Sequence, residues 1–173
     1  MRYVSRYQSP LGQIILGSDG EKLSGLWFEG QKYFDKEAVK AAEERELSVF
    51  EDTRRWLDTY FAGKIPDFTL PLAANGSEFR RTVWEMLLEI PYGCVMTYGE
   101  IASRIAKMRG QDTMSAQAVG GAVGHNPVSL IIPCHRVVGS DGKMTGYAGG
   151  IEKKIWLLAM EKADMQRFSE RRN

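Results

Sequence analysis

The tetrapeptide Pro133–Arg136 places a cysteine between a proline and a histidine. A thiol becomes a strong nucleophile only as the thiolate, and a neighbouring histidine is one of the few side chains that can generate that form at neutral pH. The apolar run Leu130–Ile132 comes just before it and is typical of a strand, which would hold Cys134 at the end of a rigid element. The alternative is a buried free cysteine, which is common in proteins. The flanking residues must decide between the two.

Motifs on both sides of this tetrapeptide follow an order that is typical of one protein family. They are Gln117-Ala118-Val119-Gly120-Gly121-Ala122, Asn126-Pro127, Val137-Val138-Gly139, Gly146-Tyr147-Ala148-Gly149-Gly150, Lys154 and Trp156-Leu157-Leu158-Ala159-Met160-Glu161. In this order they resemble the O6-alkylguanine-DNA alkyltransferase family, the suicide DNA-repair proteins. The resemblance is strong over about residues 77–162. It is looser over the first 75 residues, where Ser9-Pro10-Leu11-Gly12 and Tyr60-Phe61-Ala62-Gly63 carry it.

The resemblance implies a reaction in which Cys134 takes a methyl or other alkyl group from O6-alkylguanine in DNA, once per protein molecule. His135 would accept the thiol proton through an ordered water, and Glu161 would orient and polarise His135. Asn126 would brace the turn between the recognition helix and the nucleophile. Tyr98 would hydrogen-bond the flipped base and protonate guanine as it leaves. Without the resemblance, Glu161 is equally an exposed helix glutamate and Tyr98 a core aromatic residue.

A helix that consists largely of glycine and alanine is predicted from about Ser115 to Val123. Its small residues are Ala116, Ala118, Gly120, Gly121, Ala122 and Gly124. A glycine inside a helix lowers stability by about 0.5–1 kcal/mol relative to alanine, so several glycines in one short helix need a physical reason. Either another helix packs closely against it, or it approaches a nucleic-acid groove. Because only Gln117 could read base edges, a smooth helix suits the minor groove, where shape and backbone contacts dominate. The resemblance also implies the minor groove.

The resemblance implies further contacts with DNA outside this helix. Tyr147 and Ala148 would belong to a loop that closes over the flipped base, and Lys154 matches a functionally placed lysine. The alternative for Lys154 is a solvated helix face, and Arg136 is assigned mainly to a structural ion pair. The expected DNA-binding residues are Ala116, Gln117, Ala118, Gly120, Tyr147, Ala148 and Lys154.

Ala148 stands where serine is frequent in the family, and alanine should be tolerated because the contact there is largely through the backbone N–H. Three other features depart from the family pattern. Gln117 replaces an arginine that fills the gap left by the flipped base. The loop from Lys107 to Met114 is several residues longer than usual, and Ser129 stands where some relatives carry a proline. These departures concern the grip on DNA and the range of alkyl groups. No metal and no cofactor are expected, because the two histidines and two cysteines do not form a zinc-ligand pattern.

Composition and charge set the protein class. The chain of 173 residues is 43% hydrophobic, has no apolar run of transmembrane length and has no signal-peptide core at its N-terminus. Two cysteines, one in a reactive context, fit a reducing cytoplasm. The net charge is +1. Residues 1–76 carry 10 basic and 12 acidic side chains, and residues 77–173 carry 13 and 10, which is weak support for DNA contact by the second half.

Turn residues and periodicity predict an α/β protein of the α+β type with two domains and a tail. Residues 1–75 should form a small sheet with helices, ribonuclease-H-like by resemblance. Residues 76–165 should form a mostly helical alkyltransferase domain with a winged helix-turn-helix, and residues 166–173 a polar tail. Expected strands are 3–7, 13–16, 23–28 and 94–96, and expected helices are 35–46, 49–62, 77–90, 97 onward, 115–123 and 152–163. Asp141-Gly142 should form a hairpin turn.

Two other functions are compatible with parts of the pattern. A lesion sensor would flip alkylguanine and recruit other repair proteins, but such relatives lack the cysteine that Cys134 provides. A transcription regulator would need an additional domain, and none is visible. We expect double-stranded DNA with O6-alkylguanine as the partner, no membrane association and a monomer. The sequence leaves open the oligomeric state, the preferred alkyl size and any activity on O4-alkylthymine.

Overall fold

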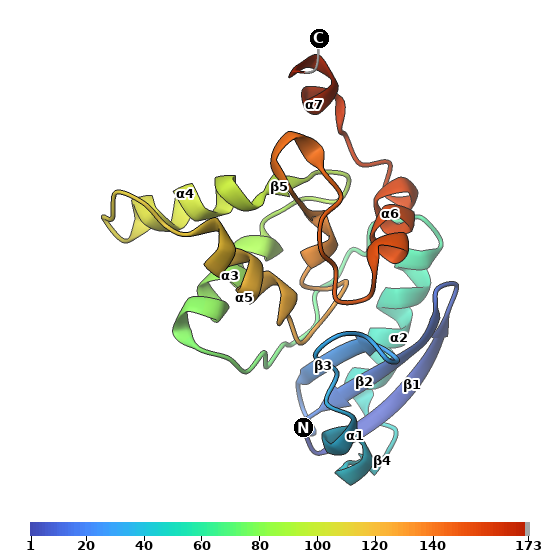
Figure 1. The fold of residues 1–173 in the computed structure, drawn as a ribbon. Coiled ribbons are helices and arrows are strands. Elements are labelled where there is room, and N and C mark those ends of the chain that lie inside the picture. Colours follow the sequence, from blue (N-terminus) through green and yellow to red (C-terminus); the bar gives the residue numbers. More distant parts are fainter. Residues whose placement is uncertain (172–173) are drawn as a thin grey trace. The chain divides into compact units, whose positions relative to one another are not determined.

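The structure is a computed structural model that describes residues 1–171 (Figure 1). The chain divides into two compact units. The first comprises residues 1–75 together with 127–129, and the second comprises residues 76–126 together with those from 130 onward. No helix formed by the described residues is long and apolar enough to cross a membrane.

The first unit is built on a four-stranded sheet in the order β3-β2-β1-β4. Antiparallel pairing joins β1 to β2 and β2 to β3, whereas β4 runs parallel to β1. The outer edge of β3 is covered by two short segments. Leu23 bonds to the backbone of residues 71 and 73, and Leu26 to that of residues 127 and 129. The strands are β1 Tyr3–Ser9, β2 Gly12–Ser18, β3 Leu23–Phe28 and β4 Glu43–Glu44. The three predicted strands of this unit are confirmed.

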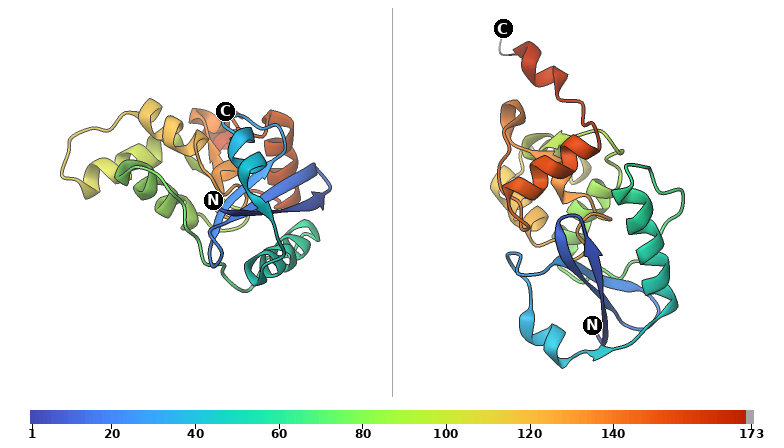
Figure 2. Two further views of the ribbon diagram at one scale, coloured as in Figure 1. Left: turned by 90° about the horizontal axis from the view of Figure 1, so that it is seen from below. Right: turned by 90° about the vertical axis from the view of Figure 1, so that its right-hand side faces the viewer.

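Two helices accompany this sheet, α1 Lys36–Ala41 and α2 Ser48–Phe61 (Figure 2). The prediction of one helix over 35–46 is wrong, because the chain becomes extended at Ala42 and β4 follows. The backbone N–H of Glu43 donates to Arg2 and that of Arg45 donates to Val4, so this segment completes the edge of β1. No side chain of α1 is buried, so packing does not extend the helix further. Helix α2 buries Val49, Phe50, Thr53, Leu57 and Tyr60.

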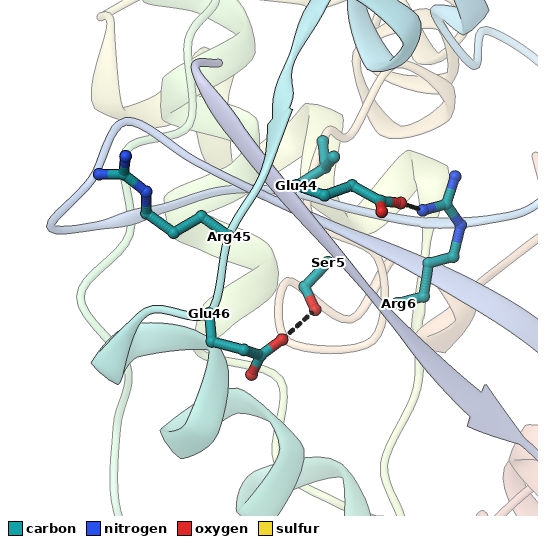
Figure 3. A pocket seen from close by; sticks show the side chains of 6 residues that line it. Ser5, Arg6, Glu44, Arg45 and Glu46 are labelled. Carbon is teal, nitrogen blue, oxygen red and sulfur yellow. Dashed lines mark hydrogen bonds and ion pairs between the residues drawn. The ribbon is translucent and has the colours of Figure 1, made fainter.

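A pocket beside β1 and β4 in the first unit is lined mainly by charged side chains (Figure 3). Arg6 pairs with Glu44, and Ser5 Oγ donates to Glu46 Oε1 over 2.8 Å. Glu46 also pairs with Arg54 of α2. The charged side chains here neutralise one another and hold the short strand in place. We therefore assign this pocket a structural role.

The second unit consists mainly of helices and holds a short parallel sheet, β5 Met96–Thr97 with β6 Val137–Val138. Side-chain caps begin three of its helices. Ser77 Oγ accepts from the N–H of Arg80, Thr97 Oγ1 from that of Glu100, and Ser115 Oγ from that of Ala118. The helices are α3 Glu78–Leu88, α4 Tyr98–Met108, α5 Ala116–Gly124, α6 Ile151–Met160 and α7 Gln166–Arg171, with 3-10 turns η1 Cys134–Arg136 and η2 Ser140–Gly142.

Helices α4 and α5 form the predicted helix-turn-helix, and α3 packs against both (Figure 1). The indole N–H of Trp84 on α3 donates to the carbonyl of Ala122 on α5 over 2.9 Å. This bond satisfies a carbonyl near the end of α5 and fixes the angle at which the helix leaves the core. The start of α5 stays exposed.

The prediction of a strand over Leu130–Ile132 is wrong. Leu130 has a φ of +71°, which a strand excludes, and the segment is a turn that leads into η1. Leu130 and Ile132 are apolar because they are buried, not because they pair in a sheet. A short apolar run does not distinguish these two causes. Cys134 is thus held by a tight turn rather than by a strand.

The hairpin turn and the last helix that were predicted for the second unit differ in detail from those in the structure. Asp141 and Gly142 both have positive φ, and the N–H of Gly139 donates to the carbonyl of Lys143 over 2.8 Å, so the predicted turn is present. No strand follows it within residues 143–150, and β6 pairs with β5 instead. The predicted helix over 152–163 ends at Met160.

The segment expected as a polar tail is largely ordered. Residues 166–171 form α7, and Phe168 is buried against Val95, Val138 and Leu158. Its ring lies over Gly142, where a Cβ would come within 2.7 Å of the ring. One buried aromatic residue among polar neighbours gives no periodic signal. Residues 172 and 173, also assigned to the tail, lie outside the described residues.

Candidate active site and DNA interface

Cys134 is buried and begins the turn η1. Its backbone N–H donates to the carbonyl of Ile132 over 2.8 Å, which closes a tight turn just before the thiol. The same carbonyl accepts from Asn126 Nδ2 over 2.7 Å, and Asn126 is itself buried. Two donors on one carbonyl fix the peptide that precedes the cysteine. The structure therefore places Asn126 at the turn that the resemblance assigns to it.

His135 and Glu161 meet in the interior of the second unit. His135 Nε2 and Glu161 Oε2 lie 2.6 Å apart, and both side chains are fully buried. Arg136 forms a fork on the same carboxylate, with Nε 2.8 Å from Oε1 and Nη2 3.2 Å from Oε2. The N–H of Gly93 also donates to Oε1 over 3.3 Å. Glu161 directly follows the last residue of α6 and is buried, so the alternative of an exposed helix glutamate is wrong.

Burial and hydrogen bonding in this cluster set the protonation of the histidine. Burial alone would raise the pKa of Glu161, but the hydrogen bonds from His135 and Arg136 and the charge of Arg136 outweigh it and hold the pKa at about 2. Burial lowers the pKa of His135, against the opposing effect of Glu161. We therefore assign a neutral ring that donates from Nε2 to the carboxylate. Such a tautomer carries its basic lone pair on Nδ1.

Three further side chains lie within electrostatic reach of the thiol, namely Tyr98, Tyr147 and Lys154. Burial raises the pKa of both tyrosines, and a charge on Cys134 would raise them further. The hydroxyl of Tyr147 is buried and has no hydrogen-bond partner among the described residues. Burial lowers the pKa of Lys154 from 10.5 to about 8, with Cys134 opposing that shift. These three groups lie up to 56 positions apart in the sequence, from Tyr98 to Lys154.

Lys154 does not lie on a solvated face. It is fully buried, and its Nζ donates to the carbonyls of Thr145 and Gly146 over 2.7 and 3.2 Å. The ammonium therefore fixes the position of Thr145 and Gly146, which come just before Tyr147 in the chain. Lys154 is one of the residues expected to bind DNA, and the structure places its side chain in the interior, bonded to the segment that precedes Tyr147.

The exposed start of α5 carries the other expected DNA contacts. Ala116, Gln117 and Ala118 are exposed, and Gly120 is half-buried. A Cβ at Gly120 would lie 3.9 Å from the Tyr98 ring, an ordinary contact, and a Cβ at Gly121 would meet nothing within 4 Å. Close packing against another helix therefore does not explain Gly121. Without a side chain at Gly121, this part of the α5 surface stays smooth and exposed.

Sequence reasoning missed two features of this site. Arg136 shares the carboxylate of Glu161 with His135, so its ion pair is part of the reactive cluster rather than separate from it. Gly93 contributes a backbone donor that no side-chain pattern reveals. Within the described part of the chain, no three histidine, cysteine or acidic side chains gather in a way that could hold a metal ion.

A buried cysteine, a neutral histidine and a buried carboxylate thus lie within the same unit as a helix-turn-helix. They define a protein in which a cysteine nucleophile is built into a nucleic-acid-binding fold. Residues 78–163 match the DNA binding domain of 6-O-methylguanine DNA methyltransferase, and residues 2–74 match its ribonuclease-like domain. The chain belongs to the 6-O-methylguanine DNA methyltransferase family.

Individual relatives agree with this assignment. A methylated-DNA–protein-cysteine methyltransferase from Haemophilus influenzae is 42% identical over 161 residues, which cover 92% of this chain and 86% of the relative. The solved structure of Mycobacterium tuberculosis O6-methylguanine methyltransferase is 39% identical and superposes with a TM-score of 0.81, covering 97% of this chain and 99% of that one. Mycobacterium tuberculosis OGT in complex with DNA is 36% identical with a TM-score of 0.80, covering 96% and 98%.

Proposed function

We propose that this chain repairs DNA by moving a methyl or larger alkyl group from O6 of guanine to the sulfur of Cys134, once per molecule. The observation that carries this proposal is the buried pair of His135 and Glu161, in which His135 directly follows the buried thiol in the chain. Such a pair can accept a proton without exposing the site to bulk water. The names of the relatives, which are methyltransferases of methylated DNA, support the same reaction.

The reaction begins with formation of the thiolate. Cys134 and His135 are successive residues of a turn with three residues per turn, so their side chains diverge and one bridging water would carry the proton to Nδ1. The resulting imidazolium is stabilised by Glu161, which Arg136 keeps ionised. The thiolate then attacks the alkyl carbon in line with the bond to O6. A carbon–sulfur bond forms, and guanine departs with the electron pair of the broken carbon–oxygen bond.

Tyr98 supplies the second proton of the reaction. Its phenol would hydrogen-bond the flipped base and donate its proton to guanine as the base leaves. The thioether on Cys134 is then stable, since the site offers no second nucleophile that could remove the alkyl group. One protein molecule therefore repairs one lesion.

We further propose that α5 enters the minor groove while the damaged nucleotide is flipped out of the stack, which costs a few kcal/mol. The smooth surface at Ala116, Ala118 and Gly121 suits this groove, and Gln117 would occupy the gap left by the base. The DNA complex of the Mycobacterium tuberculosis relative supports DNA as the partner. One chain holds all the reacting groups, so we take the protein to act as a monomer. Its two free cysteines fit the cytoplasm.

The alternative of a lesion sensor is not supported. It requires the reactive cysteine to be missing, whereas Cys134 is present with its histidine and carboxylate. The alternative of a transcription regulator is not favoured either, because both units match one repair family.

The test is a single incubation with a duplex that contains O6-methylguanine, followed by intact-protein mass and peptide mapping. We expect one added methyl group per protein, on Cys134, and none on the exposed Cys94. The C134S variant is the control and should gain no methyl group. A methyl group on Cys94, or continued turnover with excess DNA, would contradict the proposal.

A further inference from the structure

Helix α7 makes specific contacts with the segment that carries Tyr98. Arg167 Nη1 pairs with Glu100 Oε1 at 2.5 Å, and Nη2 donates to the carbonyl of Val95 over 3.3 Å. Val95 precedes β5 and Glu100 lies in the first turn of α4. One guanidinium therefore bonds to the chain on both sides of Tyr98, three residues before it and two residues after it.

The first turn of a helix needs such support. Its leading N–H groups have no partners within the helix, and here the Thr97 hydroxyl caps that of Glu100. Tyr98 is the first residue of α4, so its backbone lies at the end that frays most readily. A planar fork that bonds to two points of this segment restricts its motion more than a single charge could.

Arg167 is itself held firmly. Its guanidinium lies 4.5 Å from the ring of Phe168, which is buried against Val95, Val138 and Leu158. The entry to α7 is fixed as well, because the N–H of Asp164 donates to the carbonyl of Gly93 over 2.9 Å and the Asp164 carboxylate caps Gln166. Gly93 is the residue whose N–H contacts Glu161. The C-terminal segment thus leads from the reactive carboxylate to the helix that presents Tyr98.

We propose that Arg167 is a positioning residue for Tyr98, and that α7 is part of the alkyl-transfer site rather than a tail. This inference rests on the proposed function, in which Tyr98 contacts the flipped base. The Arg167–Glu100 pair is partly exposed, with 41% of each side chain accessible, so its contribution to stability is small. Its main effect is on where the phenol sits when the base arrives.

The test is a double-mutant cycle on the full chain, with single-turnover transfer measured at saturating DNA. R167M keeps the aliphatic stem and removes the fork, and we expect it to slow methyl transfer about three- to fivefold, in line with a weak exposed contact. R167K keeps the charge without the fork and should restore only part of the rate. In the Y98F background, R167M should change the rate by less than about twofold, because the group it positions is already missing.

Two further measurements separate positioning from folding. Amide hydrogen exchange at residues 98–101 should accelerate in R167M, while the melting temperature changes little. R55M, which removes a comparable exposed ion pair with Asp52 in α2, should leave the transfer rate unchanged. Equal slowing by R167M in the Tyr98 and Y98F backgrounds, or no slowing in either, would overturn the inference. Failure of the wild-type protein to accept any methyl group would instead overturn the proposed function.

Discussion

The carboxylate of Glu161 contacts both Arg136 and His135. Arg136 holds it ionised, burial favours the neutral form of His135, and the carboxylate accepts the Nε2 proton of that ring. Nδ1 is then the basic nitrogen. Neither an arginine nor a histidine alone would give this arrangement. We therefore expect the reactivity of Cys134 to depend on a residue 27 positions away in the chain.

Replacing Glu161 by glutamine tests this dependence. E161Q should slow methyl transfer by about tenfold or more, because general-base assistance contributes about 10²–10⁴ in rate. DNA binding should change little, since the residue is buried. The free energy of unfolding should fall by about 3 kcal/mol, because Arg136 loses its buried counterion. Single-turnover kinetics, DNA titration and denaturant unfolding measure the three effects, and equal losses in transfer and binding would assign Glu161 to the fold instead.

At the scale of elements, replacing Gly121 tests whether α5 approaches DNA. G121A should stabilise the protein by about 0.5–1 kcal/mol, because alanine favours the helix and its Cβ meets nothing within 4 Å. If this face approaches the minor groove closely, the same variant should bind DNA more weakly. Denaturant unfolding measures the change in stability, and DNA titration measures the change in affinity. Increased stability with unchanged DNA affinity would place the groove elsewhere.

Gln117 allows a second test of the same helix. An arginine there would add a charge and a longer reach into the gap left by a flipped base. Q117R should therefore bind matched duplexes more tightly, and the slope of log affinity against log salt should become steeper by about one. The measurement is a salt series with wild type and variant on the same DNA. Identical slopes would show that Gln117 is not at the gap, and Arg109 in the loop after α4 would become the candidate.

Elements with strong local signals were predictable, and those set by distant contacts were not. The caps at Ser77 and Thr97 and the apolar periodicity of α2 and α3 act within a few residues, so the sequence alone indicates them. The apolar run Leu130–Ile132 was misread because burial and strand pairing select the same residue types. Helix α7 was missed because Phe168 is buried by residues far away in the chain.

The main side chains of the candidate site could be named from the sequence, but their geometry could not. The resemblance supplied Cys134, His135 and Glu161, and their roles in the reaction remain predictions. Two features needed three-dimensional information: the burial of Lys154, and the sharing of the Glu161 carboxylate by Arg136 and His135. Lysine and arginine on a helix or turn are usually solvated, so the sequence does not indicate either feature.

At the scale of the whole molecule, the buried carboxylate links folding to acidity. The pKa of Glu161 falls from an ordinary 4.5 to about 2 in the folded state. Its contribution to stability is therefore complete above about pH 4.5 and is lost as the pH falls toward 2, by about 3 kcal/mol in total. Denaturant unfolding from pH 6 to pH 2 should show this loss in the wild type. E161Q should lack that part of the pH dependence, and parallel curves for the two proteins would contradict the assignment.

The covered edge of β3 has a consequence for how the chain is made. Residues 127–129 bond to Leu26, yet they are synthesised about a hundred residues later than the strand they cover. During translation, which proceeds from the N-terminus, the first unit therefore remains incomplete until part of the second has left the ribosome. An uncovered strand edge is a template for pairing with other chains. Between the synthesis of Leu26 and that of Val128, this part of the β3 edge is therefore open to pairing with other chains.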